Sequence, residues 1–192
     1  TGCDRYSEGC RNCYALAMIP RLQKGFKQEK YANGTKVTCH YGVMEEVLRR
    51  KKPAMYFVCS MSDLFHHEVP LEFIQYLFGI MNQARQHQFI LLTKRSQRLA
   101  ELAPSLNWTP NIRMGVTVES TKHLDRIEHL KQVPAHVRWL SLEPLLTSMD
   151  DLTPDMLEGI HWVVVGGESG RGARLMKTEW AQQVRDLCTG LG

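Results

Sequence analysis

Apolar residues along the chain gather into six short runs, at 36–41, 54–60, 88–93, 112–118, 137–142 and 161–167. Most of these runs are continuously apolar in the middle, as QFILLT and HWVVV show, and do not alternate with polar residues. Continuous runs of this length are typical of parallel strands that are buried on both faces. The pattern therefore predicts about six parallel strands.

The stretches between these runs have the spacing of apolar residues that amphipathic helices show. The clearest is 70–86, which starts at Pro70, and the others are 12–24, 96–103, 120–132 and 177–188. Pro20 is expected to kink or end the first of them, because proline disrupts the helical hydrogen-bond ladder. Strands and helices alternate along the chain, which predicts one α/β domain over residues 1–192 with a parallel sheet, either rolled into a barrel or open.

The composition is that of an ordinary globular protein, since 43% of the 192 residues are hydrophobic and 23% are charged. The net charge of +4 is mild and the basic residues are scattered, so the charge permits a phosphate-bearing partner without requiring one. No run of 18 apolar residues and no signal peptide is recognisable, so we expect no membrane association. We therefore expect a cytoplasmic protein.

Polar, charged or glycine residues follow the predicted strands. The carboxyl ends of parallel strands form one edge, where α/β folds bind their ligands, so we expect these residues to line a single site. They are Ser60, Ser62, Asp63, Lys94, Glu119, Glu143, Gly166, Gly167 and Glu168. The alternative is that such residues only cap the following helices, which suits Ser120 but not Glu143, because Pro144 follows it at once.

The segment TGCDRYSEGCRNCYA, at residues 1–15, holds Cys3, Cys10 and Cys13 in a C-x6-C-x2-C spacing. Crowded thiols in a cytoplasmic chain favour a metal or cluster over disulfides, although C-x2-C alone also occurs in redox sites. A structural zinc site requires four ligands, and Cys39 or His40 is a candidate for the fourth. Three thiolates on a [4Fe–4S] cluster would instead leave one iron open to a substrate or cosubstrate.

Further blocks accompany this motif, namely SMSDLF (60–65), LLTKR (91–95), GVTVES (115–120), LSLEPLL (140–146) and VVVGGESGRGAR (163–174). Together with the cysteine segment they resemble a three-cysteine family associated with phages and prophages, which is labelled as of unknown function and regarded as radical-SAM-like. The resemblance extends from the first residues to about residue 180. It implies a partial (βα) barrel, similar to a TIM barrel, a [4Fe–4S] cluster and S-adenosylmethionine. Most radical SAM enzymes have the shorter spacing C-x3-C-x2-C.

The resemblance also implies a reaction. Cys3, Cys10 and Cys13 would each bind one iron, and S-adenosylmethionine would bind the fourth through its amino and carboxylate groups. One electron from a flavodoxin- or ferredoxin-type donor would cleave the cosubstrate to methionine and a 5′-deoxyadenosyl radical, which takes a hydrogen atom from the substrate. The family context favours a nucleotide or modified DNA base as the substrate and a partner protein encoded nearby. The sequence assigns no catalytic residue.

The residues at the strand ends are the candidates for holding this cosubstrate. Glu119 or Glu143 is expected to accept hydrogen bonds from the ribose hydroxyls or the methionine ammonium group. Lys94 or Arg95 is expected to pair with the methionine carboxylate or with a substrate phosphate. The side chains of Ser60, Ser62 and Asp63 are expected to form hydrogen bonds with polar groups nearby.

The segment GGESGRGAR, at 166–174, is a second candidate binding element. Gly166 and Gly167 would let the backbone approach a ligand beside Glu168, while Arg171 and Arg174 would add positive charge for an anion. The spacing is neither that of a dinucleotide fingerprint nor that of a P-loop. The alternative is a tight surface turn.

Two further interpretations stay open. His66 beside Asp63 is a candidate acid–base pair, although histidines in such loops are more often solvated. The cysteines also allow two other classes of protein. One is a zinc-stabilised nucleic-acid-binding protein without catalysis, and the other is a thiol redox protein that uses Cys10 and Cys13.

Overall fold

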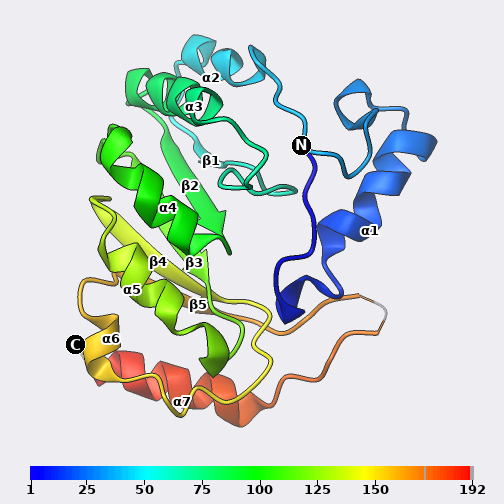
Figure 1. The fold of residues 1–192 in the computed structure, drawn as a ribbon. Helices are drawn as coiled ribbons and strands as arrows, with labels where there is room; N and C mark the ends of the chain where they lie inside the picture. The colour runs from blue at the N-terminus through cyan, green and yellow to red at the C-terminus, as the bar shows by residue number, and fades with distance from the viewer. Residues whose placement is uncertain (171, 191–192) are drawn as a thin grey trace.

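The computed structural model describes residues 1–170 and 172–190, and a parallel sheet organises them. Its strands are β1 (Met55–Phe57), β2 (Gln88–Thr93), β3 (Ile112–Thr117), β4 (Val137–Leu142) and β5 (Trp162–Val165). Every neighbouring pair is parallel, and the strands lie in the order in which they follow one another in the chain. The sheet curls into a half-barrel, which confirms the predicted partial barrel with five strands in place of six (Figure 1).

The predicted strand at 36–41 is wrong. Residues 37–40 form no strand and pair instead with the N-terminal segment, through hydrogen bonds that join the backbones of Thr1 and Thr38. His40 also bonds the hydroxyl of Thr1, with 2.9 Å between its Nε2 and Oγ1. The polar side chains of this run serve these local contacts, and the N-terminal segment itself forms an isolated parallel bridge from Gly2 to Ser62, just after β1.

Helices follow the strands as predicted, with a few differences at the ends. They are α1 (Tyr14–Pro20), α2 (Glu46–Arg49), α3 (Leu71–Gln83), α4 (Ser96–Leu102), α5 (Asp125–Lys131), α6 (Pro154–Leu157) and α7 (Thr178–Thr189). The predicted helix over 12–24 ends as α-helix at Pro20 and continues as one π-helical turn, Arg21–Gly25. The short helices α2 and α6 were not predicted, because four residues carry too little periodicity. In the part of the chain that the structure describes, no helix has the length and apolar character that crossing a bilayer requires.

The hydrophobic core lies between the outer face of the sheet and the helices that cover it, as Figure 1 shows for α3, α4 and α5. Strand β3 illustrates the division, because Ile112, Met114 and Val116 alternate along it and are fully buried in this core. Gly115 and Thr117 point to the opposite, concave face. The carboxyl ends of the strands point toward the N-terminal loop and α1, so this edge carries the candidate site.

An aromatic group occupies the concave face. The Trp139 indole packs edge to face against Trp162 on β5, with 5.1 Å between ring centroids, and against Phe57 on β1, at 6.4 Å. Gly115 makes this possible, because a Cβ atom at that position would overlap the Trp139 ring. The glycine in β3 is therefore a packing requirement of the concave face.

We predict that Gly115→Ala lowers the free energy of unfolding by about 1–3 kcal/mol, because the added methyl group must displace the indole ring. Gly79→Ala is the matched control, since Gly79 lies inside α3 with open space around its missing Cβ. The control should be neutral or stabilising by up to about 1 kcal/mol. Urea unfolding of both variants measures the difference, and equal effects would contradict this account of the concave face.

Candidate functional site

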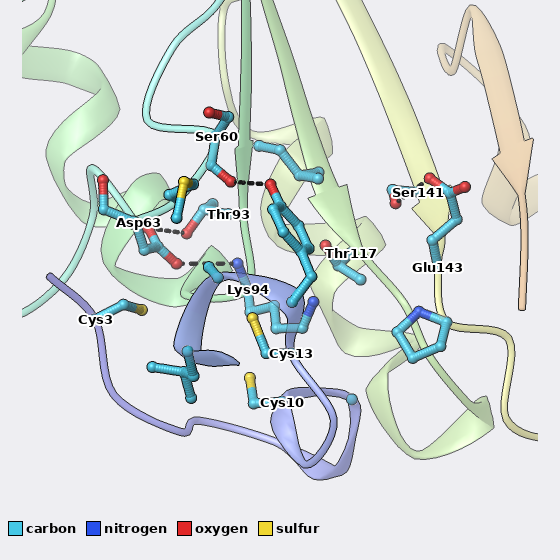
Figure 2. A pocket seen from close by; sticks show the side chains of 18 of the residues that line it. Cys3, Cys10, Cys13, Ser60, Asp63, Thr93, Lys94, Thr117, Ser141 and Glu143 are labelled. Carbon is cyan, nitrogen blue, oxygen red and sulfur yellow. Dashed lines mark hydrogen bonds between the residues drawn. The ribbon is translucent and has the colours of Figure 1, made fainter. Parts of the chain in front are cut away.

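A cavity of about 400 Å³ lies at the carboxyl ends of the strands, beneath the N-terminal loop. Its volume falls within the range of small-molecule sites. The predicted residues that line it are Cys3, Cys10, Cys13, Ser60, Ser62, Asp63, Lys94, Glu143, Gly167 and Glu168 (Figure 2). Glu119 and Gly166 lie directly behind this lining, where Glu119 contacts Gly9 and Gly166 contacts Glu143. Sequence reasoning therefore located this edge of the sheet correctly.

The three motif cysteines reach the cavity from one loop, residues 1–13. Cys10 ends a short 3₁₀ turn, Glu8–Cys10, and is buried, whereas Cys13 immediately precedes α1. Burial raises the pKa of the Cys3 thiol to about 11, and the nearby Asp63 carboxylate adds to the effect. Binding a metal through Cys3 therefore requires the release of a proton that the apoprotein holds firmly.

The sulfur atoms of Cys3, Cys10 and Cys13 do not all lie within 4.8 Å of one another. Tetrahedral zinc holds thiolate sulfurs roughly 3.8 Å apart, from a Zn–S length of about 2.3 Å. Among residues 1–170 and 172–190, the one group of three metal-ligand types with all donor atoms within 4.8 Å of one another is Asp4, His66 and His67. The cysteine trio therefore does not have zinc-site spacing in this structure.

Neither proposed fourth ligand lies with the trio. His40 bonds Thr1, and Cys39 lines a separate small cavity that it shares with Cys59. Cys59 also reaches the edge of the main cavity, but its electrostatic neighbours are Ser62, the N-terminal amine, Asp63 and Cys39. Among the described residues a fourth thiol, that of Cys59, thus lines the same cavity as the trio, whereas Cys39 and His40 do not line it.

The Asp4, His66 and His67 group has poor geometry for a metal ion. The two imidazole rings are stacked, with centroids 4.3 Å apart and an angle of 28° between their planes. Nitrogen lone pairs lie in the ring plane, so those of stacked rings run side by side and do not converge. His66 Nε2 instead lies 3.1 Å from Asp4 Oδ1. The predicted acid–base pair of His66 with Asp63 is not formed, because the Asp63 carboxylate is bonded by Thr93 and Arg95.

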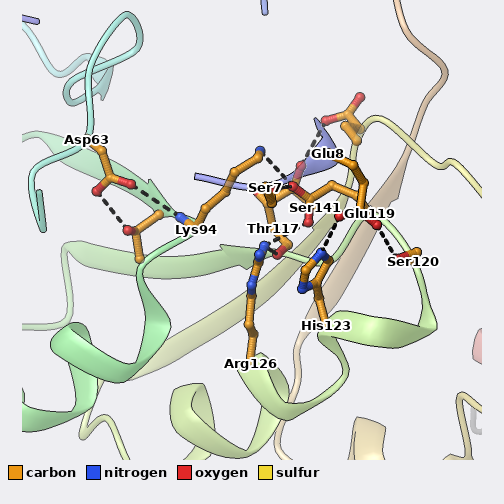
Figure 3. A network of polar contacts seen from close by, with 12 residues as sticks. Ser7, Glu8, Asp63, Lys94, Thr117, Glu119, Ser120, His123, Arg126 and Ser141 are labelled. Atoms are coloured by element: carbon orange, nitrogen blue, oxygen red, sulfur yellow. Dashed lines mark hydrogen bonds and ion pairs between the residues drawn. The ribbon is translucent and has the colours of Figure 1, made fainter. Parts of the chain in front are cut away.

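A buried carboxylate anchors the cysteine loop to β3 and β2 (Figure 3). Glu119 is fully buried and accepts hydrogen bonds from Arg126, at 2.7 Å, and from the Ser7 hydroxyl. Lys94 Nζ lies 3.7 Å from Glu119 Oε1, the oxygen that also accepts the Ser7 hydrogen bond. A Cβ atom on Gly9 would come within 2.5 Å of this carboxylate, so the loop rests directly on it. The two oxygens of Glu119 are thus engaged by the protein itself.

A second contact joins Glu8 of the cysteine loop to the start of the segment after β3. The Glu8 carboxylate accepts a hydrogen bond from the Ser120 hydroxyl, at 3.0 Å, and lies 3.0 Å from His123 Nε2. The hydrogen bond with His123 holds the pKa of Glu8 well below its usual range, at about 2. Ser120 does precede a 3₁₀ turn, Thr121–His123, but its hydroxyl makes no capping bond there and serves the cysteine loop.

The segment after β5 provides a third anchor. Glu168 pairs with Arg174 through two oxygens and accepts a 2.8 Å hydrogen bond from Asn12 in the cysteine loop. Arg174 also donates to the carbonyl of Glu8, at 2.8 Å. Arg174 lowers the pKa of Glu168 to about 2. In the structure this segment clasps the loop, and Arg171 lies outside the described residues.

Two charged groups in the cavity are left for a ligand. Glu143 accepts one long hydrogen bond, 3.3 Å from Ser141, and no cationic nitrogen of the described chain lies within 4.0 Å of it. Its carboxylate lies against Gly166, where a Cβ would approach to 2.6 Å. Lys94 shares Glu119 with Arg126 and lines the cavity. Arg95, by contrast, is occupied by Asp63 and Asp4.

A comparison with protein families identifies the family to which the chain belongs. The family model described as "Protein of unknown function (DUF5131)" matches residues 1–192. The chain belongs to the DUF5131 family. No curated protein and no solved structure gives a significant match to it.

Sequence reasoning about this DUF5131 protein missed several residues of the cavity. Phe57 and Trp139 line it, and both had the sequence features of core residues. Asn12, which holds Glu168, also lines it. The glycine at 115 was the available signal, because a strand glycine indicates a close approach by another group.

The ion pair between Glu168 and Arg174 predicts that the stability of this DUF5131 protein depends on pH. Glu168 has a depressed folded-state pKa, so its contribution to stability is complete above its unfolded pKa near 4.3 and is lost as the pH falls toward about 2. Glu168→Gln should therefore lower the free energy of unfolding by about 1–2 kcal/mol at pH 7. The difference in the free energy of unfolding between the variant and the wild type should become smaller as the pH falls from 4 to about 2. Urea unfolding across this pH range is the measurement, and a gap that does not change with pH would exclude the clasp.

Proposed function

We propose that the protein is a radical SAM-type enzyme of the cytoplasm. Cys3, Cys10 and Cys13 would hold a [4Fe–4S] cluster, and S-adenosylmethionine would bind beside it in the cavity. The observation that carries this proposal is the convergence of the three motif thiols on one cavity at the carboxyl ends of a curled parallel sheet. The phage and prophage association rests on the sequence resemblance.

The donor set supports a cluster better than a single ion. Thiolates are the usual ligands of iron–sulfur clusters, and each would bind a different iron. The three thiols of the motif would leave one iron of a four-iron cluster for the cosubstrate. When bound, the cluster would supply one electron, received from a flavodoxin- or ferredoxin-type protein, to cleave S-adenosylmethionine.

The chain's own residues would position the cosubstrate. Glu143 has the free acceptor oxygens that the methionine ammonium or the ribose hydroxyls require, and Gly166 leaves room for its carboxylate. Lys94 would pair with the methionine carboxylate while Glu119 keeps it oriented. Tyr14, fixed by its hydrogen bond to the carbonyl of Ser60, covers one side of the cavity and would help to exclude water.

The aromatic residues Phe57 and Trp139, which line the cavity, support a nucleotide or nucleic-acid base as the substrate. Phe57 is half exposed there, beside the Trp139 indole, and aromatic rings of this kind stack with nucleobases. The hydroxyls of Thr117 and Ser141 lie along the same lining and could orient the polar edge of a base. A hydrogen atom would be taken from a substrate held between this aromatic floor and the cosubstrate.

We predict that anaerobic reconstitution with iron and sulfide gives about four irons per chain. The electron paramagnetic resonance spectrum of the reduced protein should change when S-adenosylmethionine is added. Uptake of zinc without iron under the same conditions would contradict the proposal. It would favour the zinc-stabilised nucleic-acid-binding alternative.

Cys10→Ala should prevent assembly of the full cluster while the sheet stays folded, because Cys10 belongs to the loop and not to the main core. Iron analysis and circular dichroism measure the two effects. Cys188→Ala is the matched control, since Cys188 lies on α7 outside the cavity lining, and it should retain the iron content of the wild type. A Cys10→Ala protein that holds four irons would show that the ligand assignment is wrong.

Glu143→Gln should weaken the binding of S-adenosylmethionine to the reconstituted protein about tenfold, because a charged hydrogen-bond acceptor is lost. Glu101→Gln, a change on the exposed face of α4, should leave the affinity unchanged. Equilibrium binding of the cosubstrate and thermal unfolding of both variants give the comparison. Equal affinities in the two variants would remove Glu143 from the site.

A further inference from the structure

Arg95 is a buried cation at the edge of the cysteine site. It is 5% exposed, and its Nη1 lies 3.0 Å from Asp63 Oδ2 and 3.9 Å from Cys3 Sγ. Its Nη2 donates to Asp4, the residue that follows Cys3. One guanidinium therefore joins two carboxylates to one of the three thiols.

The surroundings fix this guanidinium in place. Asp63 is held by the Thr93 hydroxyl at 2.7 Å and by the backbone N–H of Phe65 at 2.9 Å, so its carboxylate cannot turn away. The ring of Tyr6, in the cysteine loop, lies 4.9 Å from the guanidinium carbon, within the range of a cation–π contact. These contacts hold the Arg95 guanidinium beside Cys3.

The Asp63 carboxylate and the Arg95 guanidinium have opposite effects on the stability of the Cys3 thiolate. The Asp63 carboxylate disfavours the Cys3 thiolate, and the Arg95 guanidinium favours it through both its charge and its N–H group. Asp4 takes up part of the same positive charge. The balance among these groups determines the electrostatic potential at the sulfur.

We propose that Arg95 is a positioning residue that donates a hydrogen bond to the Cys3 thiolate and, against Asp63 and Asp4, sets the reduction potential of the cluster. The inference rests on the proposed function. Hydrogen bonds and positive charge at a cluster sulfur stabilise the reduced form, which carries one more negative charge, and so raise the potential. Asp4 has the opposite effect because it neutralises the guanidinium.

Two substitutions should therefore shift the midpoint potential in opposite directions. Arg95→Gln removes the positive charge and should lower the potential, whereas Asp4→Asn removes a competing negative charge and should raise it. Arg98→Gln is the matched control, because in the described residues the hydrogen bonds of the Arg98 side chain go to the carbonyls of His66 and Val69 and to no cysteine. The control should keep the potential of the wild type.

The measurement is an anaerobic redox titration of the reconstituted proteins without S-adenosylmethionine, after iron per chain has been determined for each. Full iron content with an unchanged potential in Arg95→Gln would overturn the inference and leave the proposed function standing. If Arg95→Gln does not fold, Asp4→Asn decides, because Asp4 is 56% exposed and its loss should not unfold the chain. A raised potential then supports the inference and an unchanged one overturns it. A wild-type protein that takes up no iron refutes the proposed function, and the inference with it.

Discussion

The fully buried carboxylate of Glu119 is the contact on which the candidate site depends. It lies at the end of β3, where Arg126 from α5 and Lys94 from the end of β2 meet it, and the cysteine loop closes over it through Ser7. A buried charge without partners is costly, so the loop and the sheet stabilise each other through this group. Removing the carboxylate would leave Arg126 and Lys94 without this partner, and removing the loop would cost Glu119 its hydrogen bond from Ser7.

Most polar residues at the strand ends serve the architecture of the site and not a ligand. Asp63 fixes Arg95, Glu168 fixes Arg174 and Asn12, and Glu8 is fixed by residues that follow β3. The cysteines are consequently held by three strand ends at once. What remains for a ligand is chiefly Glu143, the hydroxyls near it and Lys94, a small set that carries one charge of each sign.

The sequence predicted the architecture well because periodicity and strand ends are local signals. Five of the six predicted strands form, and α3 and α7 appear within a few residues of their predicted limits. The run at 36–41 failed because its polar residues found partners in the N-terminal segment, which periodicity cannot reveal. The rim residues were correctly gathered at one edge, but nothing local indicates that the partner of Glu168 is Asn12, 156 positions earlier.

That separation has a consequence for biosynthesis. The cysteines precede the strands in the sequence, but the contacts that hold their loop join residues as far apart as Glu8 and Arg174, 166 positions on. Domains fold as units once enough chain has emerged, and contacts this distant in sequence form late. The contacts of Glu8 and Asn12 with the segment after β5 therefore form only once that segment has been made. Until then the three cysteines lie in a loop that lacks this support.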